Sequence, residues 1–175
     1  VGKLGPLVSF MQETSPAKLV PLLVAQLKSG TQLETLVSAA ALANARAFGG
    51  QDYTGYHTFM ALMPAYRMTT ELAVDRRALP VLKVLYRNSS RIQEQHVEHH
   101  DKLHPIDGTA SVATGNGGEQ LRDAIRAVDW NGAQARFAAV ADKKPLSAFN
   151  QLQYAIQDAA DVHRVVLASP AWAPL

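Results

Sequence analysis

The sequence predicts an all-α protein. Apolar residues recur at helical spacing along most of the chain, helix start and stop signals bound these segments, and no alternating apolar and polar segment competes with them. The chain has 175 residues, the size of about one domain, and 47% of them are hydrophobic, which suits a packed core. We therefore expect a single all-α domain over residues 1–175, a bundle of about six or seven helices built from helical hairpins.

Helix signals bound the first two predicted helices. Ser15 followed by Pro16 is typical of a helix start, and an apolar stripe follows up to a Gly stop. The next stretch, residues 31–50, opens with Thr31 and Glu34 at capping-box spacing and ends at two glycines. The short connection predicts that the two helices pack as an antiparallel hairpin through an Ala-rich face.

The third and fourth predicted helices lead to the histidine-rich part of the chain. Residues from Tyr53 to Met68 are apolar or aromatic on most sides, which predicts a helix near the centre of the core, kinked or divided by Pro64. A fourth helix follows Asp75 and becomes polar as it approaches the histidines, through which it can continue. Its inward positions are Leu79, Leu82, Leu85, Tyr86 and Ile92.

The last third of the chain begins with a predicted loop over residues 105–117, because Gly, Asn, Thr and Ser are frequent there. Two helices are predicted over residues 118–130 and 131–143, and one long helix over residues 145–169, which Pro170 stops. The predicted inward-facing residues of these helices are Leu121, Ile125, Val128, Phe137, Val140, Leu146, Phe149, Leu152, Ile156, Val162 and Val165 or Val166.

Composition excludes several classes of function. There is no cysteine, so thiolate metal sites, iron-sulfur clusters and cysteine nucleophiles are excluded, and any metal must be held by His and carboxylate side chains. A formal net charge of +2 with scattered Lys and Arg argues against nucleic acid as a partner. No apolar run of about 18 residues predicts a membrane span. The first residue, Val1, fits a mature exported chain, which we prefer, or a fragment of a longer one.

The segment HVEHHDKLH, residues 96–104, holds four of the six histidines. In a continuous helix His96, His99 and His100 stand at positions i, i+3 and i+4, so the three imidazoles share one face, and His104 follows one turn later. An i, i+4 pair of imidazoles supplies two ligands for zinc, iron or copper. We therefore predict a divalent transition-metal site, with haem held by two histidines as a further possibility.

Other residues complete the predicted site. His57 in the third helix and His163 in the last helix are candidate metal ligands, Asp101 is a candidate base or orienting group, and Tyr56 would lie near the open coordination position. Each histidine also has a plainer interpretation. His57 would be a buried core residue, His163 an interior residue between Val162 and Val166, and the cluster a solvated surface strip.

The order of candidate ligands is similar to that of HD-domain metal phosphohydrolases, all-α enzymes that use a His, an adjacent His-Asp pair and a distant Asp. The corresponding residues here are His57, then His100 with Asp101, then Asp158 or Asp161. Those families carry an apolar run before the His-Asp pair, where this chain has EQHVEH. Because of this departure we do not assign the chain to that family.

Two hypotheses follow from the sequence. The first is a metal-dependent enzyme that acts on a small molecule, an oxidoreductase in preference to a hydrolase. The second is a non-catalytic helical interaction domain, in which the histidines form a surface strip and a partner subunit completes an oligomer or larger chain. The position of His57 relative to the 96–104 segment discriminates between them.

Overall fold

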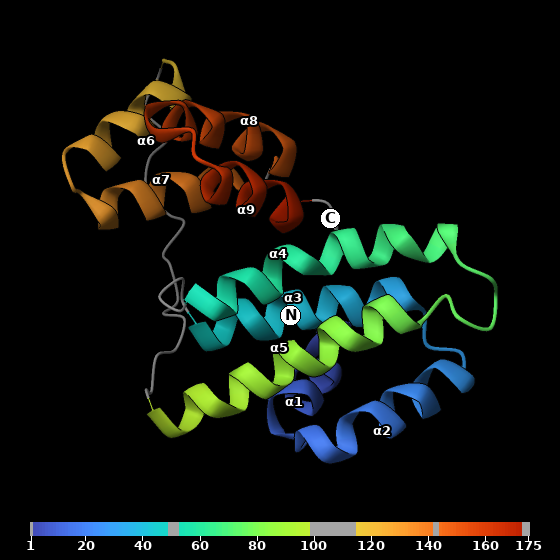
Figure 1. The fold of residues 1–175 in the computed structure, drawn as a ribbon. Coiled ribbons are helices and arrows are strands. Elements are labelled where there is room, and N and C mark those ends of the chain that lie inside the picture. Colours follow the sequence, from blue (N-terminus) through green and yellow to red (C-terminus); the bar gives the residue numbers. More distant parts are fainter. Residues whose placement is uncertain (1, 49–52, 99–114, 142–143, 173–175) are drawn as a thin grey trace. The chain divides into compact units, whose positions relative to one another are not determined.

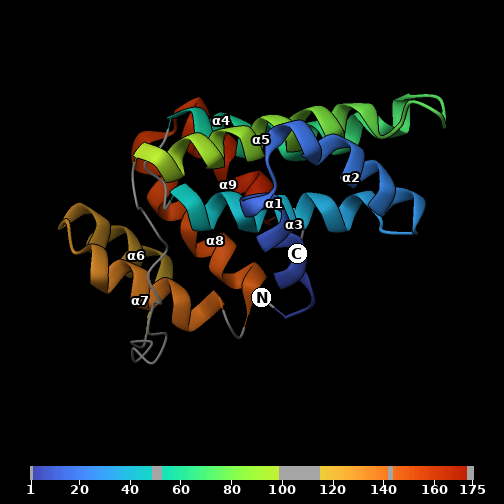
Figure 2. The same ribbon diagram turned by 90° about the horizontal axis from the view of Figure 1, so that it is seen from below.

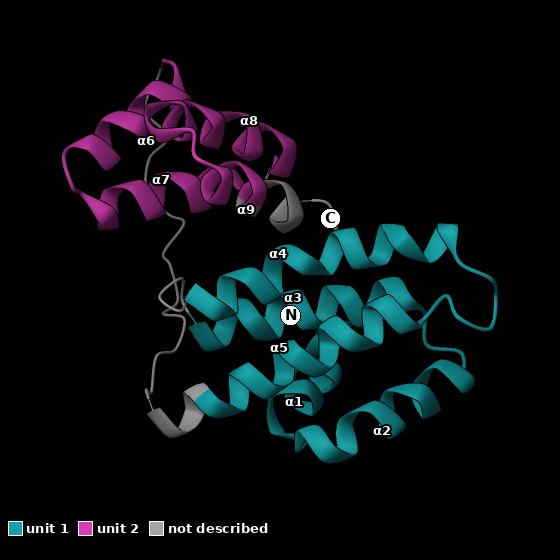
Figure 3. Cartoon of the chain, in the orientation of Figure 1, with its two compact units in different colours: residues 1–103, 173–175 teal, residues 104–172 magenta. Residues whose placement is uncertain are grey.

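The computed structural model describes residues 2–48, 53–98, 115–141 and 144–172. All the regular elements in these ranges are helices, so the predicted all-α class is confirmed, and the nine α-helices exceed the six or seven expected (Figure 1). The chain divides into two compact units, α1 to α5 in unit 1 and α6 to α9 in unit 2 (Figure 3). That residues 1–175 work as one domain stays a prediction.

Unit 1 contains five α-helices and two short 3₁₀ helices. Their bounds are η1 Gly2–Leu4, α1 Gly5–Glu13, α2 Pro16–Lys28, α3 Leu33–Phe48, α4 Tyr53–Met68, η2 Thr69–Glu71 and α5 Leu79–Glu98. The predicted start of α2 at Ser15 and Pro16 is confirmed, whereas α1 was not predicted. The capping box before α3 is absent, because Thr31 donates its hydroxyl to Gln26 Oε1 at 3.0 Å and the helix begins at Leu33.

Helix α3 is the centre of unit 1, because α1, α4 and α5 all pack against it, while α2 packs against α5 (Figures 1 and 2). The predicted hairpin of α2 with α3 is therefore not the main packing, and the antiparallel hairpin of this unit is α4 with α5. Small side chains make the close packing of α3 possible. Those buried along it are Ala39, Ala40, Ala43 and Ala47.

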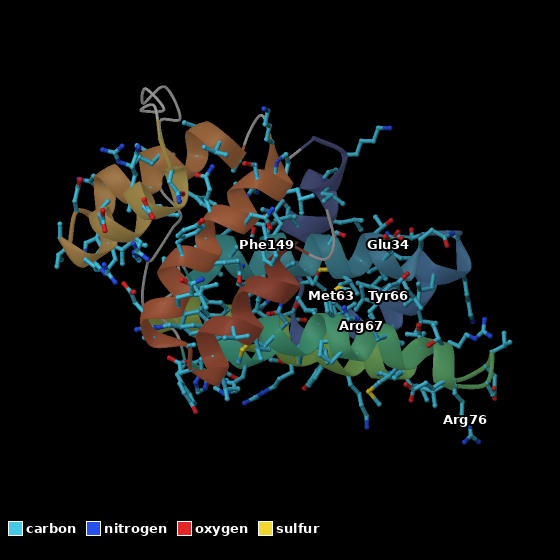
Figure 4. The ribbon with its side chains drawn as sticks, turned by 90° about the horizontal axis from the view of Figure 1, so that it is seen from above. Glu34, Met63, Tyr66, Arg67, Arg76 and Phe149 are labelled. Atoms are coloured by element: carbon cyan, nitrogen blue, oxygen red, sulfur yellow. The ribbon has the colours of Figure 1, made fainter. Side chains whose placement is uncertain are left out.

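Helix α4 is continuous through Pro64, so the predicted division is absent. Pro64 removes one backbone hydrogen bond, but the buried side chains of Leu62 and Ala65 hold the helix on both sides of it. At its start, a Cβ on Gly55 would lie 2.7 Å from the ring of Phe48, so the glycine lets α4 approach the end of α3. The charged side chains of Glu34, Arg67 and Arg76 are exposed (Figure 4).

Unit 2 contains four α-helices, of which α6, α7 and α8 pack against one another and α9 packs against α8. Their bounds are α6 Gly117–Arg126, α7 Trp130–Ala141, α8 Pro145–Ile156, η3 Gln157–Ala159 and α9 Val162–Trp172. Asn116 caps α6, since its side-chain oxygen accepts hydrogen bonds from the backbone N–H groups of Gly118 at 3.0 Å and Glu119 at 3.4 Å.

Gly117 and Gly118, which lie where the predicted loop meets the next predicted helix, thus both belong to the first turn of α6. A Cβ on Gly118 would collide with the ring of Tyr154, so this residue permits the contact between α6 and α8. The hydroxyl of Tyr154 accepts a hydrogen bond from Asn116 Nδ2 at 3.2 Å, which links the cap of α6 to α8. Of the predicted loop, residues 105–114 lie outside the described residues.

The prediction of one long last helix over residues 145–169 is wrong, because helix α8 ends at Ile156 and a separate helix, α9, begins at Val162. Asp161 caps the new helix: its Oδ1 accepts a hydrogen bond from the backbone N–H of Arg164 at 3.0 Å. Pro170 lies inside α9 rather than after it. The break turns α9 back along α8. Several residues of these two helices that were predicted to face inwards are exposed. These are Leu146, Val162, Val165 and Val166.

Three further inward assignments also fail. Leu79 and Tyr86 of α5 are exposed, while Leu82, Leu85 and Ile92 of the same helix are buried as predicted. Val128 is 65% exposed, because the chain has left α6 and adopts a φ of +61° at this residue. In the described ranges, moreover, none of the helices combines the length and the apolar character needed to cross a membrane.

Candidate ligand pocket

His57, the central residue of the sequence-based hypothesis, is exposed on α4. The buried face of this helix carries Gly55, Thr58 and Phe59, so the interpretation of His57 as a core residue is wrong. Its Nδ1 lies 2.7 Å from the backbone oxygen of Tyr53, and the two rings are 4.3 Å apart between centroids at an angle of 56°. Both rings therefore belong to the surface of the first turn of α4, and Tyr56 beside them is partly buried.

His163 is also exposed, so its interpretation as an interior residue is wrong. Because Asp161 precedes α9 instead of lying within a helix, its carboxylate reaches the histidine, with Oδ1 3.8 Å from His163 Nδ1. The pKa of Asp161 is lowered, first by the hydrogen bond from the Arg164 backbone N–H, and further by the backbone N–H of His163 and by the nearby cations.

The histidine cluster begins inside a helix, since α5 runs through His96 to Glu98. The candidate ligands His100 and His104 and the candidate base Asp101 lie outside the described residues. Across residues 2–48, 53–98, 115–141 and 144–172, no group of three His, Asp or Glu side chains that could hold a metal ion is found. The transition-metal site, and haem as its alternative, therefore stay predictions.

Helices α3, α4 and α5 share a buried polar cluster. Asn44 Nδ2 donates to the backbone oxygen of Gly55 at 3.0 Å and to Asn88 Oδ1 at 2.6 Å, and it lies 3.2 Å from Thr58 Oγ1. Asn88 Nδ2 in turn donates to the backbone oxygen of Ala40 at 3.2 Å. Because the three side chains satisfy one another away from water, the cluster fixes how the three helices pack.

Unit 2 contains an apolar pocket. A pocket of about 450 Å³ opens where α6, α8 and α9 meet the start of α7. We call it the unit 2 pocket, and the residues that line it are Ile125, Trp130, Leu152, Ala155, Ile156, Arg164 and Ala168. Six of these seven are apolar, and the volume falls within the range of about 300 to 1,000 Å³ that is common for small-molecule sites.

Arg164 is the one charged residue of the pocket lining. Its side chain is 56% exposed, and its Nε lies 3.5 Å from Asp161 Oδ2. Arg164 therefore adds one half-exposed cationic side chain to a lining that is otherwise apolar. Its aliphatic stem can pack on apolar surface while the guanidinium stays in water.

An ion pair holds the chain at the turn between α8 and α9. Arg126, at the end of α6, contacts both carboxylate oxygens of Asp158, with Nε to Oδ2 at 2.6 Å and Nη2 to Oδ1 at 2.7 Å. This hydrogen-bonded guanidinium lowers the pKa of Asp158 below its ordinary value. The pair fixes η3 to α6, so α9 starts its return at a defined place and closes one wall of the unit 2 pocket.

Sequence reasoning missed this pocket. Ile125, Leu152 and Ile156 carry a helical apolar pattern and were predicted to face inwards; they are half-buried, and the pattern gives no sign of a cavity. One signal was available: Asp161 is a residue type that favours the N-cap position, and a helix start there would have divided the last helix. Comparisons of the chain with protein-family models, with curated proteins and with solved structures gave no match.

Proposed function

We propose that the chain is a helical binding protein and that the unit 2 pocket receives an apolar ligand. The observation that carries this proposal is the lining, in which Ile125, Leu152 and Ile156 present apolar surface around about 450 Å³ of open volume. Small-molecule sites in helical proteins commonly have this composition and lie between helices. The proposal develops the interaction-domain hypothesis of the sequence and assigns no chemical step to the site.

The surface around the pocket supports the same proposal. Trp130 lines the pocket yet is 56% exposed, and Val165 is a large apolar residue exposed on α9. Exposed apolar side chains beside an apolar pocket are typical of binding surfaces, because a ligand removes both from water. A ligand that buries about 200 Å² of apolar area gains about 5 kcal/mol before the cost of immobilising it. A gain of about 5 kcal/mol corresponds to a dissociation constant of about 0.2 mM, and the cost of immobilising the ligand weakens it, so we expect dissociation constants between about 0.2 mM and a few mM.

The test uses 1-octanol as a neutral apolar ligand and isothermal titration calorimetry of the full chain. Ala155 lines the pocket on α8, so Ala155→Phe fills it. Asn150 is exposed on the same helix, so Asn150→Phe adds the same ring outside the pocket and serves as the matched control. Far-UV circular dichroism checks that both variants keep their helix content.

The expected result is saturable binding of one octanol per chain, retained in Asn150→Phe and weakened at least tenfold in Ala155→Phe. The proposal fails if the wild-type chain binds no octanol below its solubility limit. It also fails if both variants bind as the wild type does, because the ligand would then lie elsewhere. The comparison requires that Ala155→Phe folds. Ala168→Leu, which adds volume to the pocket from α9, serves as a second variant.

A further inference from the structure

We infer that the unit 2 pocket selects amphiphiles with a carboxylate head, such as medium-chain fatty acids, through the guanidinium of Arg164. This inference rests on the proposed function, because it names the class of ligand that the pocket would take. It concerns the polar end of the ligand, whereas the proposed function concerns the apolar end. The two can therefore be tested separately.

The arrangement of the lining supports a ligand with one apolar and one anionic end. The apolar part of the lining includes Ile125, Leu152 and Ile156, which offer no polar partner from their side chains. A fully polar ligand would lose hydration there without compensation. On the α9 side of the lining, Arg164 offers a planar group of N–H donors that matches the two oxygens of a carboxylate. An alkyl chain inside and a carboxylate at Arg164 satisfy both regions at once.

Asp161 is the internal competitor for the ligand. Its Oδ2 lies 3.5 Å from Arg164 Nε, which is longer than the 2.7 to 2.9 Å typical of a strong charge-assisted hydrogen bond. The guanidinium is thus oriented by Asp161 without being tightly bound through that atom. The same carboxylate caps α9 through its other oxygen, Oδ1. Asn caps a helix about as well as Asp, so Asp161→Asn removes the competing charge and keeps the cap.

The experiment compares octanoate with 1-octanol, which have the same chain length and differ in head group. The measured quantity is the ratio of their association constants in each variant, obtained by calorimetry at low and at physiological salt. Arg164→Met removes the guanidinium and keeps an unbranched apolar stem. Arg87→Met is the matched control, because it removes the same charge from an exposed position on α5 in unit 1.

In the wild-type chain we expect octanoate to bind about fivefold more tightly than octanol, the effect of an exposed but oriented ion pair. Arg164→Met should bring the ratio to one or below, Asp161→Asn should raise it severalfold, and Arg87→Met should leave it at the wild-type value. Added salt should lower the ratio, because it screens the ion pair. Octylammonium should bind more weakly than octanol.

The outcomes separate the two proposals. If octanol binds and the ratio is one or less in the wild type, or is the same in Arg164→Met, the carboxylate inference is wrong and the apolar pocket stands. If neither octanol nor octanoate binds, the proposed function itself is wrong. A ratio that falls equally in Arg87→Met and Arg164→Met would show an effect of net charge and would also overturn the inference.

Discussion

Replacing Asn88 by Ala should selectively destabilise unit 1. Asn88 is fully buried on α5, where it accepts hydrogen bonds from Asn44 at 2.6 Å and Thr58 at 3.0 Å and donates one to the Ala40 oxygen at 3.2 Å. Thr58 can still donate to the Gly55 oxygen at 2.8 Å, so it keeps a partner. Asn44 Nδ2 keeps its bond to the same oxygen and can donate its other N–H to Thr58 Oγ1 at 3.2 Å.

Asn88→Ala removes three buried hydrogen bonds, each worth about 1 kcal/mol. We therefore expect the free energy of unfolding of unit 1 to fall by about 3 kcal/mol. With an m-value of about 1.5 kcal/mol/M, the urea midpoint should fall by about 2 M.

The assay follows two signals of the full chain during urea unfolding. Both tryptophans, Trp130 and Trp172, belong to unit 2, so their fluorescence reports that unit, while far-UV circular dichroism reports the helices of both. Only the dichroism transition should shift in Asn88→Ala. Asn150→Ala, the same change at an exposed position, should alter stability by less than about 0.5 kcal/mol. An Asn88→Ala effect no larger than this control would refute the reasoning about the buried cluster.

Three further predictions concern single residues and the histidine cluster. Val128 is a β-branched, exposed residue with a φ of +61°, a backbone conformation that glycine adopts more easily. Val128→Gly should therefore stabilise unit 2 by about 1 kcal/mol, measured by urea unfolding followed by tryptophan fluorescence. Destabilisation would contradict this backbone conformation. The carboxyl of Asp158 should titrate by NMR below its ordinary pKa of about 4 and return towards that value in Arg126→Gln. Because this pKa is lowered in the folded chain, the pair stabilises unit 2 at pH values above the pKa of the unfolded chain, and this stabilisation is lost as the pH falls through the folded pKa. An Asp158 pKa that is unchanged in Arg126→Gln would count against the pair. Finally, the histidine cluster predicts about one equivalent of iron, copper or zinc in protein purified without a metal-affinity step. This metal should be lost when His96 and His100 are both replaced by Ala. A metal-free wild-type chain would refute the metal site.

Much of the helical fold could be predicted from local signals. Ser15 with Pro16 marks the start of α2, and the buried Leu82, Leu85 and Ile92 follow the helical spacing of α5. These features depend on residues within one or two turns, which the sequence displays directly. Of the two predicted effects of Pro64, a kink or a division, the division does not occur, because buried neighbours on α4 compensate for one missing hydrogen bond, and that compensation is a tertiary effect.

The candidate sites were harder to predict because they depend on which face of each helix is covered. His57 lies in an apolar segment, but Gly55 approaches Phe48 and turns the neighbouring face towards the core, which leaves the histidine outside. Asn44 and Asn88 are 44 positions apart, and nothing local indicates that they pair. The unit 2 pocket exists because α9 turns back along α8, and apolar spacing across residues 145–169 concealed that turn.

The most direct test of the account is a methyl NMR spectrum of the chain, recorded while 1-octanol is added. The account predicts saturable shifts for the methyl groups of Ile125, Leu152 and Ile156, which line the unit 2 pocket, and none for Leu23 and Leu36, which are fully buried in unit 1. Octanol-dependent shifts confined to other residues, or no saturable shift at the three pocket residues, would contradict the claim that this chain is a binding protein for apolar ligands.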